Sequence, residues 1–172
     1  MRALTRSTLA ATAIAGLLTA AGSTGIAHAT PAANTAQTIR LHYNSAVSDQ
    51  VSQAVAHGPI AGVGAEVENF GDTGGQAIVT FADGSVVIDV AIAAEVPGFR
   101  PTACTMDLAQ SGSWSIDHGT GAYAAATGDG TFTGTRRIHG TRIKGACQGP
   151  DSGVDPRMET DDVLLTGTVS LS

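Results

Sequence analysis

Residues 116–135 read IDHGTGAYAAATGDGTFTGT. The pattern predicts a short strand that runs into Gly119-Thr120-Gly121, passes Tyr123, and is followed by a second strand rich in Gly, Thr and Phe. Two strands joined by a tight glycine turn are typical of a small antiparallel β-barrel. Gly119-x-Gly121 also resembles part of a dinucleotide fingerprint, but no helix is expected after it to hold a pyrophosphate, so we interpret the glycines as structural.

Alternating apolar and polar residues extend this pattern along the chain, and helical periodicity is almost absent. Asp83-Gly84 lies between two alternating segments and predicts a hairpin with a type I′ turn. Strands are expected over residues 38–44, 60–70, 76–82, 85–94, 102–110, 113–117, 130–136, 137–147 and 161–171. Strands in this meander order predict an all-β domain, a single antiparallel up-and-down barrel of about eight strands, with a sandwich as the alternative.

The connections between these strands carry turn signals. Val47, Val51 and Val55 recur every four residues, so residues 45–56 are expected to form a short helix or a loose connection. Residues 95–101 and 148–157 are expected to be loops, and Ser111-Gly112 a turn.

The first 29 residues have the features of a secretory signal peptide. Arg2 and Arg6 precede an apolar run over residues 9–21, and Ala27-His28-Ala29 fits a cleavage site. An uncleaved N-terminal anchor is the alternative. We therefore expect a secreted, extracellular protein with a flexible tail at 30–36, a barrel domain at 37–172 and no membrane insertion after cleavage.

The remaining chain is acidic. Without Arg2 and Arg6, seven basic residues face fifteen acidic ones, a formal charge of −8 for residues 30–172. An acidic surface repels phosphate backbones and anionic lipids, so neither nucleic acid nor a membrane is an expected partner.

Cys104 and Cys147 are the two cysteines of the chain. In an oxidising exterior such a pair is expected to form a disulfide. A metal or redox pair is the alternative, although the CxxC spacing typical of such sites is missing.

Several motifs carry a resemblance to a known family, and they are Gly58-Pro59-Ile60-Ala61-Gly62-Val63-Gly64, Phe81-Ala82-Asp83-Gly84-Ser85, Cys104, Ser111-Gly112-Ser113-Trp114, Gly119-Thr120-Gly121-Ala122-Tyr123, Cys147 and Thr166-Gly167-Thr168-Val169. Over residues 60–172 the chain resembles the allene oxide cyclase and dirigent superfamily of β-barrels, nearest to its secreted actinobacterial members. It departs from the dirigent pattern at His118, which replaces a glycine, and at 126–128, where an arginine is missing. The resemblance implies the barrel, but no catalytic residue of the cyclases matches a position here.

Glu66 and Glu68 are the candidate catalytic residues. They lie two apart on one face of the strand expected over residues 60–70. If that face lines a barrel mouth, two carboxylates ~7 Å apart would raise one pKa and supply an acid. The apolar opposite face, Val63, Ala65 and Val67, favours the other interpretation, in which both glutamates face water.

The other polar residues give weaker signals. The histidines lack metal-ligand spacing and no nucleophile elbow is present, so neither a metal nor another cofactor is expected. Asp117 and His118 are adjacent, so they should point to opposite faces and cannot pair while both lie in a regular strand. Arg136, Arg142 and Lys144 share strand parity if no bulge intervenes, and pairing with surface acids is favoured over binding an anionic group.

Alternation points four aromatic residues inward, and they are Tyr43, Phe81, Trp114 and Phe132. Eight-stranded barrels lie at the boundary between a filled core and a ligand cavity, so these rings either fill the barrel or line a pocket.

Three functions remain open. The first is a non-catalytic barrel that binds a small, largely apolar ligand or serves as an extracellular binding module. The second is a cyclase, isomerase or stereocontrolling protein that positions a reactive substrate, with Glu66 or Glu68 as acid and Tyr43 or Trp114 as pocket walls. The third is an interaction or inhibitor module that uses the segments at 95–101 or 148–160 to bind an extracellular protein.

Overall fold

The computed structural model describes residues 34–48, 50–71, 73–148 and 152–172. The expected signal peptide lies outside these residues. The elements are β1 (Thr35–Asn44), β2 (Ser52–His57), β3 (Gly62–Gly71), β4 (Gly74–Phe81), β5 (Gly84–Arg100), β6 (Thr105–Gly119), the 3₁₀ helix η1 (Gly121–Tyr123), β7 (Thr127–His139), β8 (Arg142–Ile143), β9 (Ala146–Cys147) and β10 (Met158–Ser170). None of the helices in the described part of the chain has the length and apolar character needed to cross a bilayer.

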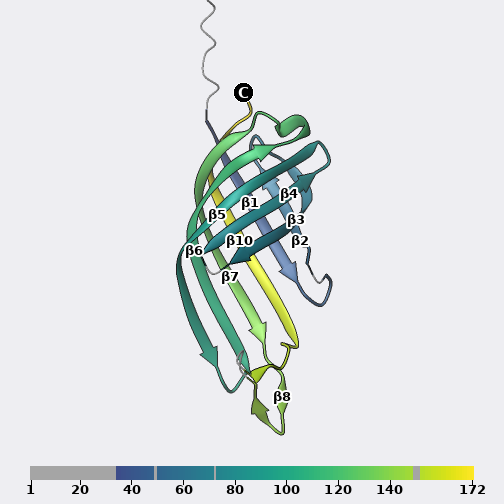
Figure 1. Ribbon diagram of the computed structural model, residues 1–172, viewed down its shortest axis with the longest axis vertical. Helices are drawn as coiled ribbons and strands as arrows, with labels where there is room; N and C mark the ends of the chain where they lie inside the picture. Colours follow the sequence, from purple (N-terminus) through teal and green to yellow (C-terminus); the bar gives the residue numbers. More distant parts are fainter. Residues whose placement is uncertain (1–33, 49, 72, 149–151) are drawn as a thin grey trace, which may run out of the picture. The chain divides into compact units, whose positions relative to one another are not determined.

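Eight antiparallel strands close into an up-and-down barrel, in the order β1-β10-β7-β6-β5-β4-β3-β2 (Figure 1). The predicted fold class is therefore confirmed. Pairing between β1 and β10 closes the barrel, from Thr35↔Val169 to Asn44↔Thr160. Closure removes the sheet edges that an open meander would expose. Because β1 begins at Thr35, the last two residues of the expected flexible tail belong to the sheet.

Two predicted interruptions are absent from the long β5–β6 pair. Residues 95–101 were expected to be a loop, but β5 continues to Arg100. Its pairing with β4 ends at Ala91, so Pro97 lies where β6 is the neighbour on one side only, a position that tolerates proline. Gly112 does not turn the chain, because a Cβ there would lie 2.7 Å from the Phe132 ring and 2.0 Å from the Ala91 carbonyl oxygen. Gly112 instead lets the Phe132 ring and the β5 backbone pack closely against β6, which continues without a turn.

Two other connections also differ from the prediction. Residues 52–57 form a strand rather than a helix or loose connection, with Ala54 and Ala56 buried inside the barrel. Residues 137–147 do not form one strand, because β7 ends at His139 and the small β8–β9 hairpin follows. Lys144 and Gly145 both have positive φ, 51° and 85°, as the turn of a two-residue hairpin requires.

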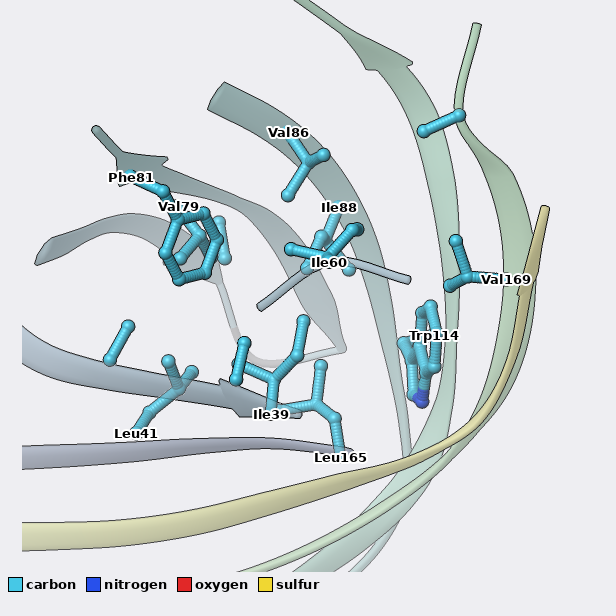
Figure 2. Close-up of a cluster of buried hydrophobic side chains, with 14 of the residues drawn as sticks. Ile39, Leu41, Ile60, Val79, Phe81, Val86, Ile88, Trp114, Leu165 and Val169 are labelled. Carbon is cyan, nitrogen blue, oxygen red and sulfur yellow. The ribbon is translucent and has the colours of Figure 1, made fainter. Parts of the chain in front are cut away.

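One half of the barrel is filled by apolar side chains (Figure 2). Ile39, Ile60 and Ile88 are at most 1% exposed. Trp114 is also buried, and its Nε1–H donates to the carbonyl oxygens of Thr131 and Thr166, both at 3.2 Å. A Cβ at Gly130 or Gly167 would lie within 2.8 Å of the indole, so inward glycines make room for the ring.

The segment quoted at the start closes this half. Tyr123 in η1 is 4% exposed and packs edge-to-face on Phe81, with ring centroids 6.0 Å apart. Ile60, between β2 and β3, also lies inside, and the Gln37 side chain bonds both its backbone N–H and its carbonyl oxygen. The backbone groups of Ile60 are thus paired even though this residue lies outside the strands.

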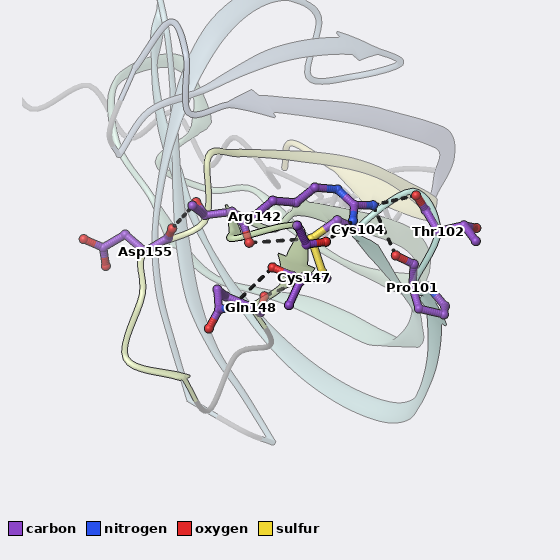
Figure 3. Close-up of a disulfide and its surroundings, with 10 residues drawn as sticks. Pro101, Thr102, Cys104, Arg142, Cys147, Gln148 and Asp155 are labelled. Carbon is purple, nitrogen blue, oxygen red and sulfur yellow. Dashed lines mark hydrogen bonds between the residues drawn. A yellow bond between two sulfur atoms is a disulfide. The ribbon is translucent and has the colours of Figure 1, made fainter.

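The disulfide joins Cys104, just before β6, to Cys147 in β9, as the sequence predicted (Figure 3). The loop it encloses spans 43 residues, for which the chain-entropy model gives about 4 kcal/mol. Arg142 donates to the carbonyl oxygens of Pro101 and Thr102, tying the hairpin to the β5–β6 turn. Such a bond indicates an oxidising compartment.

Candidate functional site

Strand β3 faces the opposite way from the prediction. Val63 and Val67 are 66% and 48% exposed, whereas Glu66 is 1% exposed. Glu66 pairs with Ser52 on β2 and Val79 on β4, both buried, and directly opposite residues of an antiparallel pair share a face. The interpretation that both glutamates face water is therefore wrong for Glu66. Glu68, two residues on, lies on the same inner face but at the exposed mouth.

Three further charged side chains join these glutamates from two strands that do not pair with β3. Arg136 lies on β7, and Glu159 and Asp161 lie on β10. Arg136 Nε is 2.5 Å from Glu159 Oε1. We call these five residues, Glu66, Glu68, Arg136, Glu159 and Asp161, the charged cluster. It contains four carboxyl groups and one guanidinium.

Burial changes how the cluster titrates. Desolvation raises the pKa of Glu66 to about 7. The hydrogen bond with Ser52 lowers this pKa, and the negative charges of Glu68 and Asp161 raise it further. Desolvation likewise raises the pKa of Asp161 to about 6, with Glu68 adding to the shift and Arg136 opposing it. Glu66 is therefore partly protonated near neutral pH.

The other two shifts have mixed causes. The pKa of Glu68 is raised, chiefly by desolvation and against the pull of Arg136, but solvent at the mouth screens this exposed carboxyl. Burial disfavours the charge on Arg136, yet its bond to Glu159 and the nearby carboxyls outweigh that and raise its pKa. Arg136 thus remains a cation already engaged by Glu159.

A cavity of about 460 Å³ lies beside the cluster, inside the open half of the barrel. Seven of the eight barrel strands contribute to its wall. Its apolar lining consists of Leu41, Phe70, Ala77, Val90, Ile92, Phe132, Val163 and Leu165. Glu68, Arg136 and Asp161 line it as well, so the same space offers apolar and charged surface.

The long strands build one side of the mouth. Strands β5, β6, β7 and β10 run on past the ends of β2, β3 and β4 (Figure 1). Glu95 on β5 and Gln110 on β6 lie on this extension, line the cavity, and are joined by a 2.7 Å hydrogen bond. The segment predicted to be a loop at 95–101 is thus partly a wall of the site.

The four predicted pocket aromatics separate into two groups. Phe132 is 5% exposed and forms part of the cavity wall, and Tyr43 lines a neighbouring hollow with Ser52, Glu68 and Arg136. Phe81 and Trp114 instead belong to the filled half of the barrel. Trp114 is therefore core and not a wall of this cavity.

Sequence reasoning missed Arg136, Glu159 and Asp161, although a signal was present. Asp161 and Glu159 continue the inward parity of Val163 and Leu165, and Arg136 continues that of Phe132. For Glu66 the signal was the pair of glycines before it. A Cβ at Gly64 would lie 2.9 Å from the Phe81 ring, so the glycine face of β3 is the inner one.

Two other expectations assumed regular strands, and the structure departs from that assumption at both places. Arg136 does not share a strand face with Arg142 and Lys144, because those two belong to the β8–β9 hairpin segment. Asp117 and His118 do meet, with His118 Nδ1 2.8 Å from Asp117 Oδ2. The pairing of β5 with β6 skips Asp117 between Ile116 and His118, and this bulge breaks the alternation that would separate them.

Within the described ranges, no group of three or more His, Cys, Asp or Glu side chains is arranged to hold a metal ion. The chemistry on offer is a buried carboxyl that titrates near neutrality, beside an apolar cavity with a charged mouth. Such a site can bind an amphipathic molecule or exchange a proton with one. The chain matches no family model, no curated protein and no solved structure.

Proposed function

We propose that this protein binds a small, largely apolar molecule in the open half of its barrel. The observation that carries the proposal is the 460 Å³ cavity inside a closed barrel whose other half is filled. Its volume lies within the range of roughly 300–1,000 Å³ typical of small-molecule sites. The lining combines eight aliphatic and aromatic side chains with polar and charged ones, so the cavity offers a ligand both apolar and polar surface.

The proposal includes the setting in which the barrel works. The disulfide supports an oxidising compartment, and the features of residues 1–29 support secretion to the exterior. The closed eight-stranded barrel is compatible with the resemblance to the allene oxide cyclase and dirigent superfamily, and we propose membership on the motifs quoted above. In that setting the ligand is an extracellular small molecule.

Native mass spectrometry of the protein purified from its secreting host tests the binding. We expect a mass excess that is reproducible and disappears on denaturation. The variant Ala77→Leu places extra carbon atoms in the cavity, since Ala77 is 2% exposed and lines it, and should lose the excess. Gln76→Leu is the matched control, because Gln76 is the exposed neighbour on the same strand. An excess that survives Ala77→Leu would place the ligand elsewhere.

One observation favours a second candidate, a cyclase or isomerase. Glu66 is buried, its pKa is about 7, and it lies on the inner face of the barrel beside two cavity-lining carboxyls. A group with such a pKa is suited to general acid–base catalysis at neutral pH. The recovered ligand, incubated with the protein, should then convert to an isomer of the same mass. Glu66→Gln should bind this ligand and stop the conversion, whereas no conversion by the unaltered protein would reject the enzyme.

The third function in the sequence analysis loses part of its basis. Residues 95–100 belong to β5 and so are not a loop that could present a rigid surface to a partner. We therefore do not propose an inhibitor through that segment.

A further inference from the structure

Resting on the proposed function, we infer that the ligand is an amphipathic organic cation, with an apolar body in the cavity and a protonated amine at the charged cluster. Three features of the cluster and its surroundings support this: the balance of charge, the unpaired carboxyl oxygens, and the apolar space that continues from them.

The balance of charge favours a cation. Arg136 is the one basic side chain among the described residues that line the cavity, and Glu159 already engages it. Glu66, Glu68 and Asp161 remain as three carboxyl groups without a cation of their own in the cluster. Glu95, which also lines the cavity, adds a fourth acid, although Gln110 donates to it. An anionic head group would meet net repulsion here.

Unpaired oxygens show where the head group would lie. Within the described part of the chain, three buried side-chain atoms have no hydrogen-bond partner, and they are Glu66 Oε1, Asp161 Oδ1 and Arg136 Nε. Arg136 Nε is nevertheless held in an ion pair with Glu159, which leaves the two carboxyl oxygens without a donor. A buried acceptor left unpaired destabilises the folded protein, and more strongly when it is charged. Glu66 is 1% exposed, so bulk water is a poor partner for it. An ammonium group has three N–H donors and supplies both the missing donors and the missing charge.

The apolar lining distinguishes an organic cation from a bare ion. Ala77 pairs with Glu68 across β3 and β4, and Leu41, Phe132 and Leu165 continue the same space. A small inorganic cation would leave this surface in contact with water. An ammonium attached to a hydrocarbon body uses the charged and the apolar parts together.

The arrangement makes binding depend on pH. Glu68 from its own strand and Asp161 from β10 are the charged groups that act on Glu66. The adjoining hollows are also lined by Glu159 from β10, Arg136 from β7, Tyr43 from β1 and Glu95 from β5. The raised pKa values of Glu66, about 7, and Asp161, about 6, mean that both carry protons at pH 5 and are mostly ionised at pH 8. Affinity for an ammonium should therefore fall as pH decreases through this window.

Calorimetric titration with three matched probes tests the inference: 1-naphthylmethylamine, 1-naphthylmethanol and 1-naphthoate. At about pH 8 we expect the amine to bind at least about tenfold tighter than the alcohol, and the carboxylate to bind weakest. At about pH 5 the amine is still protonated, yet its advantage over the alcohol should disappear. Glu66→Gln and Asp161→Asn should each reduce the advantage at about pH 8.

Asp162→Asn is the control variant. Asp162 follows Asp161 on β10, but its side chain is 67% exposed and faces His42 outside the barrel. The pH series on the unaltered protein gives an independent result if a cluster variant does not fold. Equal or tighter binding of the alcohol or carboxylate would overturn the cation inference and leave the proposed function standing. Failure of all three probes to bind would overturn both, and calcium chloride that displaced the amine in competition would assign the cluster to a metal ion instead.

Discussion

The two halves of the barrel interior are built from the same strands but hold different contents. On β5, Ile88 is fully buried in the filled half, whereas Ile92, four residues on and on the same face, lines the cavity. On β10, Val169 packs in the core, whereas Val163 and Leu165 border the cavity and Asp161 and Glu159 lie at the mouth. The packed core and the cavity are therefore separated along the strands of this barrel rather than between strands. Each prediction below substitutes a residue in one half and its counterpart in the other half or outside.

The largest effect is expected from removing aliphatic carbon from each half. Ile88→Ala should lower the free energy of unfolding by about 4 kcal/mol, because it leaves a void among packed side chains. Ile92→Ala should cost about 1 kcal/mol, because its side chain already borders open space. Urea denaturation of both variants measures the difference. Similar losses from the two would mean that the open half is as tightly packed as the filled one.

The next effect concerns the buried carboxyl. The pKa of Glu66 is about 7 in the folded protein, against an ordinary value of 4.5, so its ionisation opposes folding as pH rises through that interval. Glu66→Gln removes this cost and should stabilise the protein by up to about 3 kcal/mol at pH 8. At pH 4.5 or below, little change is expected.

Thermal or urea unfolding at several pH values follows this difference. Asp129→Asn, on the exposed outer face of β7, is the control and should show no such pH-dependent gain. A gain that is equal at low and high pH would show that Glu66 does not titrate in this interval.

A smaller effect is expected from adding carbon to each half. Ala56→Leu should destabilise the protein by about 2 kcal/mol, because it overfills the packed half of the barrel. Ala77→Leu should change stability by less than about 1 kcal/mol, because the cavity can accept the side chain. Melting temperatures of the two variants measure the difference in stability. A larger loss from Ala77→Leu than from Ala56→Leu would mean that the unfilled volume lies in the other half of the barrel.

The smallest effect is expected outside the barrel. His42 Nδ1 and Asp162 Oδ1 are 2.8 Å apart, but both side chains are solvent-exposed. Exposed ion pairs contribute little, so Asp162→Asn should alter the free energy of unfolding by about 0.5 kcal/mol or less. A larger change in denaturation experiments would mean that the outer face contributes to stability in the way that the filled half does.

Much of the fold could be predicted from patterns that span only a few residues of the sequence. The alternation of Ala77, Val79 and Phe81, then of Val86 and Ile88, correctly gave the inner faces of β4 and β5, and Asp83-Gly84 gave their hairpin. The two cysteines gave the disulfide. These features depend on local rules of strand parity, turn geometry and redox chemistry, and those rules act within a few residues or on a single pair.

The candidate site was less accessible because it depends on which face of each strand is inside. On β3 the apolar residues point outward and the glycines inward, the reverse of the usual signal. The reason is volume: Phe81 from the next strand occupies the space above Gly64. Likewise Arg136 was interpreted as a surface residue although it shares the inward parity of Phe132, and its contact with Glu159 depends on the pairing of β7 with β10.

The order of residues was enough to establish an all-β chain, the pairing of Cys104 with Cys147, and a set of inward apolar residues sufficient to close a barrel. The folded chain was needed to show that Glu66 is buried, that four carboxyls and one guanidinium gather at one end, and that a cavity lies beside them. Period-two alternation fixes that a strand has two faces, but the volumes of side chains from neighbouring strands decide which face is inside. In this protein that choice places the glutamates of β3 within the barrel.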